Sequence, residues 1–157
     1  MRRMLLAAVF TFGACGGSTP SSGPTAPTPT AAPAPATATN IAGTYTLTIQ
    51  TSSVCTQLPS QFRTRTYVAT ITQSGANFAV NLTGNFAVQQ LSGTVSGTTI
   101  SAIGGFVEET TAFGMSGELH GTVSGSTISA TLNGSFFVGG FGGGCNATDH
   151  RFTFTRR

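Results

Sequence analysis

The side chains that could do acid–base or metal chemistry are few and widely spaced in this chain of 157 residues. They are four acids and two histidines: Glu108, Glu109, Glu118, Asp149, His120 and His150. Neighbouring residues on a strand point to opposite faces, so Glu108 and Glu109 do not make a carboxylate dyad. His120 follows Glu118 by two residues, and we interpret these two as a surface pair on the polar face of a strand.

No metal or phosphate motif stands out either. A zinc site needs three or four ligands, which two histidines do not supply. The glycine-rich run at residues 139–144 lacks the lysine and the following helix of a phosphate-binding loop. We therefore expect no catalytic residue, no metal and no cofactor, and interpret the chain as a protein that is not an enzyme.

The charge content excludes a further class of partner. Charged residues make up only 7% of the chain, well under the usual quarter or so. Without Arg2 and Arg3, five arginines face four acids, and the net charge is +1. Nucleic-acid binding needs a concentrated basic patch, so we expect no nucleic-acid partner.

The N-terminus is typical of a secretory signal. Arg2 and Arg3 precede a short apolar segment at residues 5–12, which is too short to span a bilayer as a helix. Gly13 and Ala14 then stand directly before Cys15. Residues 12–15, Phe-Gly-Ala-Cys, resemble the lipobox of bacterial lipoproteins. The alternative is an ordinary signal peptide that happens to contain a cysteine.

The lipobox resemblance implies that residues 1–14 are removed as a signal peptide and that Cys15 becomes a lipidated N-terminus. Two acyl chains anchor a protein stably where one holds only marginally. By the same resemblance, Gly16 in place of an aspartate implies the outer membrane if the cell is a diderm. We expect the protein in the cell envelope, on the periplasmic face or at the cell surface.

Residues 15–39 form the expected disordered linker. Six of the seven prolines of the chain lie here, among Thr, Ala and Ser. Proline fixes φ and removes a backbone donor, so this stretch favours neither helix nor sheet. Such a spacer reaches up to about 70 Å when extended.

From residue 40 onward, apolar and polar residues alternate with the period of half-buried strands. The pattern predicts one domain at residues 40–157 with eight strands, near residues 43–51, 63–74, 77–84, 90–96, 98–106, 113–124, 126–138 and 148–156. Tight turns are expected at Gly75, Gly97 and Gly125. At each turn, the apolar residues of the two strands that it joins lie on the same face of the sheet. Long connections alternate with these turns, so hairpins collect at one end and loops at the other.

The second and third cysteines fit this arrangement. Cys55 lies in the first long loop and Cys145 in the last, and closing the sheet brings the first and last strands together. A disulfide between them is favoured by export from the cytoplasm. Eight antiparallel strands favour a closed up-and-down barrel, with a two-sheet sandwich as the alternative. A membrane-spanning barrel wants aromatic girdles, and this chain has no Trp and two Tyr.

A second resemblance concerns the first and last strands. The opening Gly43-Thr44-Tyr45 is similar to the Gly-X-Trp opening of lipocalins. The resemblance implies that an arginine of the last strand covers this aromatic ring. By parity, Arg156 shares the inner face with Phe152 and Phe154 and would stack on Tyr45.

The predicted interior suggests a pocket. Small residues (Ala102, Gly104, Gly117 and Gly134) lie toward the loop end, and bulky ones lie toward the hairpins. The alternative is that these glycines serve strand bending. The residues expected to line a ligand site are Arg65, Tyr67, Ala102, Glu108, Met115, Phe136 and His150. Arg65, Glu108 and His150 could instead form a rim ion pair at the mouth.

Two functions follow from these expectations. The first is a membrane-tethered lipoprotein whose barrel binds a small apolar or amphipathic ligand. The second is a module that uses the loop end to dock or inhibit another envelope protein.

Overall fold

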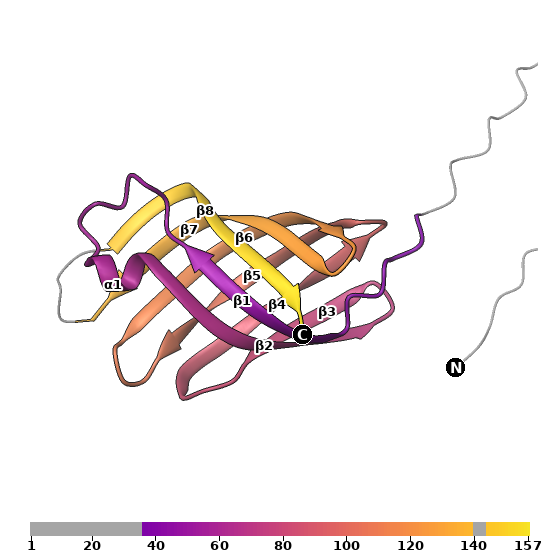
Figure 1. The fold of residues 1–157 in the computed structure, drawn as a ribbon, viewed down its shortest axis with the longest axis horizontal. Helices are drawn as coiled ribbons and strands as arrows, with labels where there is room; N and C mark the ends of the chain where they lie inside the picture. The colour runs from indigo at the N-terminus through magenta and orange to yellow at the C-terminus, as the bar shows by residue number, and fades with distance from the viewer. Residues whose placement is uncertain (1–35, 140–143) are drawn as a thin grey trace, which may run out of the picture. The chain divides into compact units, whose positions relative to one another are not determined.

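A computed structural model of the chain describes residues 36–139 and 144–157. Eight antiparallel strands each pair with their neighbours in the sequence, and β1 pairs with β8 to close a barrel (Figure 1). The strands are β1 (Gly43–Gln50), β2 (Thr64–Ser74), β3 (Asn77–Leu82), β4 (Phe86–Ser96), β5 (Thr99–Glu108), β6 (Phe113–Ser124), β7 (Thr127–Val138) and β8 (Gly144–Arg156). The expected all-β class and eight-stranded up-and-down barrel are confirmed.

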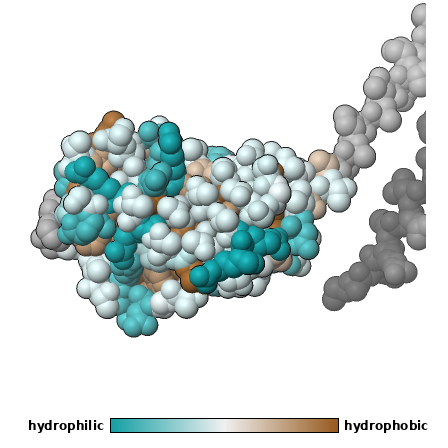
Figure 2. Space-filling view, in the orientation of Figure 1, coloured by the Kyte–Doolittle hydropathy of each residue, from teal (hydrophilic) through white to brown (hydrophobic). Residues whose placement is uncertain are grey.

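Alternation of inward-facing and outward-facing residues along most of each strand separates the core from the solvent. In β1, Tyr45, Leu47 and Ile49 are buried, while the threonines between them face outward. The same division in the other strands puts apolar side chains inside the barrel and mostly Thr and Ser outside. In Figure 2 the visible face is accordingly mostly neutral or hydrophilic, with scattered hydrophobic residues. The inward-facing side chains of all eight strands therefore form a single core.

Three two-residue turns mark what we call the hairpin end of the barrel. They follow Ser74, Ser96 and Ser124, and each begins with a glycine at positive φ: Gly75 at 60°, Gly97 at 55° and Gly125 at 56°. The second turn residue does not have positive φ, which is the pattern of a type II′ turn. These turns match the right-handed twist of the strands and fix the register predicted from the sequence.

The opposite, loop end carries the connections at residues 51–63, 83–85 and 109–112, and β7 ends and β8 begins there. The first contains α1 (Ser60–Arg63), a single turn that the sequence analysis did not foresee. Within the described ranges, no helix has the length and apolar character that crossing a membrane requires. β4 and β8 each begin four residues earlier than expected, at Phe86 and Gly144.

The hairpin end is closed by the segment that leads into β1. Ile41 is 1% exposed, and the Tyr45 hydroxyl donates to its carbonyl at 2.8 Å. Arg156 donates to the Tyr45 hydroxyl at 2.9 Å, and its guanidinium lies 5.2 Å from the centre of that ring. The expected contact between Arg156 and Tyr45 is confirmed.

Three interior glycines sit opposite one another in one row across the sheet. Gly104 pairs with Gly117, and Gly117 pairs with Gly134. A Cβ on Gly104 would meet the Gln90 carbonyl oxygen of the next strand at 1.7 Å, and its φ is 135°. These glycines therefore allow neighbouring backbones to approach closely where the sheet bends. The structure favours the bending interpretation over the expectation that they leave open space.

Candidate functional site

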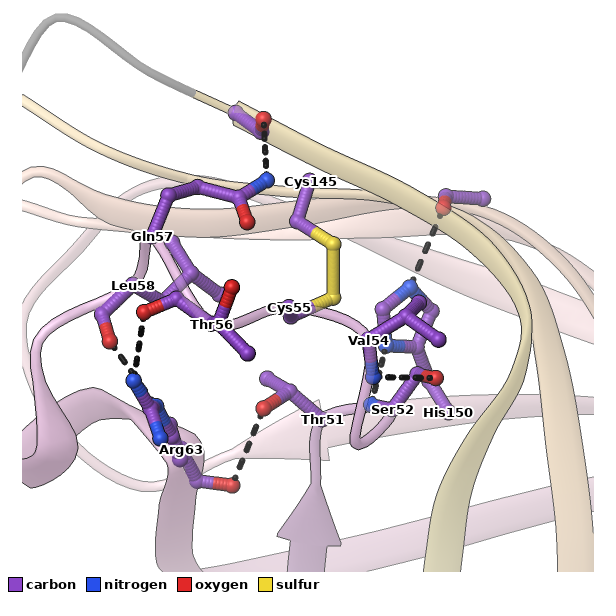
Figure 3. Close-up of a disulfide and its surroundings, with 12 residues drawn as sticks. Thr51, Ser52, Val54, Cys55, Thr56, Gln57, Leu58, Arg63, Cys145 and His150 are labelled. Carbon is purple, nitrogen blue, oxygen red and sulfur yellow. Dashed lines mark hydrogen bonds between the residues drawn. A yellow bond between two sulfur atoms is a disulfide. The ribbon is translucent and has the colours of Figure 1, made fainter.

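The loop end is braced by a disulfide between Cys55 and Cys145 (Figure 3). Their Cα atoms are 5.5 Å apart, and the bond joins residues separated by 90 positions. Both cysteines are buried. The expected pairing is confirmed, and it ties the loop after β1 to the beginning of β8.

The buried side chain of His150 forms a hydrogen bond to the same loop after β1. His150 has no exposed surface, and its Nδ1 accepts a hydrogen bond from the Ser52 amide at 3.0 Å. Its Nε2 lies 3.2 Å from the Gly134 carbonyl oxygen, to which the neutral ring donates. Burial lowers the pKa of His150, and the Gly134 hydrogen bond and the Asp149 carboxylate offset this only in part. His150 is therefore a neutral, buried residue that stabilises the loop, and it is not part of a solvent-exposed ion pair at the mouth.

A polar network crosses the mouth of the barrel from β2 to β5. Arg65 forms an ion pair with Glu108, and the Tyr67 hydroxyl donates to the same carboxylate oxygen at 2.7 Å. The Thr111 hydroxyl donates to the other carboxylate oxygen and accepts from the Phe113 amide at 3.1 Å. The Glu108 side chain is 8% exposed and that of Arg65 28%. The structure thus brings three of the predicted site residues together.

The network fixes the charge state of its members. Burial alone would raise the pKa of Glu108, but hydrogen bonds from Thr111, Arg65 and Tyr67 outweigh it and hold this pKa below its ordinary 4.5. Burial raises the pKa of Tyr67 well above its usual range. For Arg65, burial acts to lower the pKa, and the hydrogen bonds to Tyr67 and Glu108 raise it further than burial lowers it. At neutral pH the site is a carboxylate, a guanidinium and a neutral phenol.

Aromatic rings fill the barrel beneath this network. The Phe106 ring contacts those of Tyr67, Phe86 and Phe113 at centroid distances of 5.3, 5.5 and 6.1 Å. Phe62 of α1 stacks on Phe113 at 5.7 Å. The Arg65 guanidinium lies 5.4 to 5.8 Å from the ring centres of Phe62, Tyr67 and Phe113. Arg65 therefore covers this cluster of aromatic rings, which we call the plug.

The other predicted site residues are packed rather than open. Phe136 is fully buried and contacts the His150 ring at 4.4 Å. Met115 is 1% exposed, and its partner across the sheet is Phe136. Ala102 is buried deeper in the barrel, opposite Gly93 and Leu119, apart from the Arg65 network. The five hollows that we found over residues 36–139 and 144–157 include none lined by Tyr67, Glu108, Met115 or Phe136.

Three residues that contribute to the loop-end site were not predicted from the sequence. Phe62 lies in a connection expected to be irregular, and Thr111 and Ser52 were unremarkable loop residues. The only available signal was the position of Thr111 two residues before Phe113, which allows its hydroxyl to cap that amide. The Glu118–His120 pair is on the surface as expected, 3.9 Å apart, with both side chains at least 60% exposed.

In the described ranges, no three His, Cys, Asp or Glu side chains come together to hold a metal ion. Cys15 and the expected signal peptide lie outside these ranges, as does most of the expected linker. Comparison of the chain with protein-family models, with curated proteins and with solved structures found no match.

Proposed function

We propose that the protein is a lipid-anchored module of the cell envelope that binds another envelope protein through the loop end of its barrel. The observation that carries this proposal is the position of the N-terminal segment. The described part of this segment joins the barrel at the hairpin end, opposite the loops.

The contacts of this segment are specific. The Thr39 amide donates to the Gly97 carbonyl at 3.0 Å, and Gln73 donates to the Thr39 carbonyl at 3.1 Å. The Ile41 amide donates to the Gln73 side chain at 2.7 Å. Figure 1 shows this indigo segment beside the C-terminus, with α1 at the other end. A chain anchored at Cys15 would therefore be joined to its anchor at the hairpin end of the barrel, which leaves the loop end free of the linker.

The state of the barrel interior favours docking at the surface over a ligand inside. The rings of Tyr67, Phe106 and Phe113 contact one another below the mouth, and the Arg65–Glu108 ion pair lies above them. An apolar ligand would have to displace this plug. The disulfide restrains the loop after β1, so this loop loses little conformational entropy when it binds a partner.

Site-specific photo-crosslinking in cells of the source organism tests the proposal. The photoreactive residue replaces Val54, which is 66% exposed in the disulfide loop, or Ser126, an exposed turn residue at the hairpin end, as the matched control. We expect one discrete protein adduct from position 54 and none from position 126. The purified partner should then bind the wild-type chain and bind Val54→Asp at least tenfold more weakly.

Two outcomes would overturn this proposal. One is the absence of a position-specific adduct at residue 54. The other is native mass spectrometry that finds a stoichiometric lipid bound noncovalently, in addition to the acyl groups expected on Cys15, since this would support the interior ligand site instead.

A further inference from the structure

A polar hollow of about 330 Å³ lies on the outer wall of the barrel beside the loop end. It forms where β1 ends, β2 begins and β8 runs past them, because Gln50 pairs with both Thr64 and Arg151. All of its lining residues are polar or charged, and we call it the arginine hollow: Gln50, Thr51, Ser52, Ser53, Arg63, Thr64, Asp149 and Arg151. Its volume is at the lower end of that of small-molecule sites.

Arg63 is held in place on one side of the hollow. Its Nε donates to the Leu58 carbonyl at 2.9 Å and its Nη2 to the Thr56 carbonyl at 2.5 Å (Figure 3). Its own carbonyl accepts from the Thr51 amide at 2.9 Å. A guanidinium has five N–H donors, so these two side-chain bonds fix its orientation and leave the others for a ligand.

Arg151 lies on the opposite side, on β8. It is exposed on the outer face of β8, and its side chain makes no hydrogen bond or ion pair with any residue that the structure describes. Asp149 is the only acid of the hollow, and it too makes no ion pair within residues 36–139 and 144–157. Two arginines against one carboxylate leave the hollow with a net charge of +1.

The floor of the hollow is rigid. Ser52 is 4% exposed, and its amide is bound to the buried His150. Cys55, three residues further on, is tied to Cys145. The hydroxyl-bearing segment at residues 51–53 therefore keeps its shape without a ligand, which lowers the entropic cost of binding.

We propose that the arginine hollow binds the oxyanion of a small ligand, a carboxylate or a phosphate group, between Arg63 and Arg151. Guanidinium groups match both oxyanions through paired hydrogen bonds. The hydroxyls of Ser53 and Thr64 and the amide of Gln50 line the same hollow and offer further donors. This site is independent of the proposed docking of a protein.

Titration of the full-length chain in detergent with inorganic phosphate and, separately, with acetate tests the site. Two-dimensional NMR of backbone amides and arginine Nε–H groups follows the binding at pH 7. We expect saturable shifts of Arg151 and of residues 50–53, with a dissociation constant in the millimolar range. Tighter binding of phosphate than of acetate, or the reverse, identifies which oxyanion the site prefers.

Three variants make the result specific. Arg151→Gln should weaken binding about tenfold, and Asp149→Asn should strengthen it, because the only negative charge of the hollow is removed. Arg157→Gln removes the same charge at the hairpin end and should bind as the wild type does. Among the described residues, the side chains of Arg151 and Asp149 make no hydrogen bond or ion pair, so both substitutions should leave the fold intact. Shifts that do not saturate for either probe, or an Arg157→Gln effect equal to that of Arg151→Gln, would overturn the proposal.

Discussion

His150 lies between Ser52 and Gly134 with no exposed surface, so each ring nitrogen already has a partner. Protonation of Nδ1 would turn two donors toward each other and break the bond to the Ser52 amide. Burial places the pKa of the folded state below 6.5, the ordinary value. Below about pH 6.5 the unfolded chain therefore binds the proton more readily, and stability falls as the pH drops.

We expect the free energy of unfolding to decline between pH 6.5 and the folded-state pKa of His150, measured by urea denaturation. His150→Gln should abolish this decline, because an amide can accept from Ser52 and donate to Gly134 without titrating. His120→Gln, on the exposed outer face, is the control and should leave the decline intact. An unchanged decline in His150→Gln would contradict the role given to His150.

The Glu108 carboxylate accepts the hydrogen bonds of the polar network at the mouth of the barrel. Glu108→Ala leaves Arg65, Tyr67 and Thr111 without their shared acceptor, and we expect a loss of about 2 to 3 kcal/mol in the free energy of unfolding. Glu109→Ala is the matched control, since this neighbouring side chain is exposed, and should cost less than about 0.5 kcal/mol. Arg65→Ala combined with Glu108→Ala should cost less than the sum of the two single losses. Full additivity in denaturant unfolding would show that the pair does not interact.

At the scale of elements, the disulfide joins the loop after β1 to β8. Its loop of 90 residues contributes about 4 to 5 kcal/mol in the chain-entropy model. Cys55→Ala with Cys145→Ala should lower the free energy of unfolding by this amount while the chain keeps its β-sheet circular dichroism. Addition of a reductant to the double variant is the control and should change nothing further. A loss below about 1 kcal/mol would mean that β1–β8 pairing alone holds the loop end.

The glycine row gives a second prediction at this scale. Gly104→Ala places a Cβ against the Gln90 carbonyl oxygen at a φ that side chains rarely adopt, and should cost about 2 to 4 kcal/mol. Gly75→Ala is the matched control, because its φ is also positive but nothing lies within 4 Å. It should cost about 1 kcal/mol. Equal losses in thermal unfolding would mean that close backbone approach is not what selects glycine at position 104.

The sequence predicted the strands because a period of two is repeated over long stretches and three Ser-Gly turns fix the register. It did not predict α1, since a single turn around Phe62 has no periodicity. It also placed the starts of β4 and β8 too late, because outward-facing Val88 and the segment around Gly144 do not alternate. Gly104 was ambiguous for a physical reason: a missing side chain is equally consistent with open space and with a close backbone contact.

For the whole molecule, the two ends of the barrel differ in structure. The hairpin end receives the N-terminal segment and is sealed by Ile41, Tyr45 and Arg156. The loop end holds the disulfide, the Arg65–Glu108 network and the arginine hollow. The proposed function uses this difference: it assigns attachment of the linker to the hairpin end and partner binding to the loop end.

The last prediction concerns the tether itself. The outward-facing residues of the described strands are mostly Thr and Ser, and the proposal assigns membrane attachment to Cys15. If lipidation of Cys15 is the anchor, Cys15→Ser should move the chain from the membrane pellet to the supernatant of fractionated cells. Acyl chains contribute about 0.8 kcal/mol per buried CH₂ group, so losing them removes nearly all membrane affinity.

The control must separate anchoring from folding. Cys15→Ser leaves Cys55 and Cys145 paired, so the variant should unfold at the same temperature as the wild type. Mass spectrometry of the wild type should find the acyl groups on a chain that begins at Cys15. A variant that still sediments with membranes would show that something other than Cys15 holds the protein there, and the proposed lipid anchor would then be wrong.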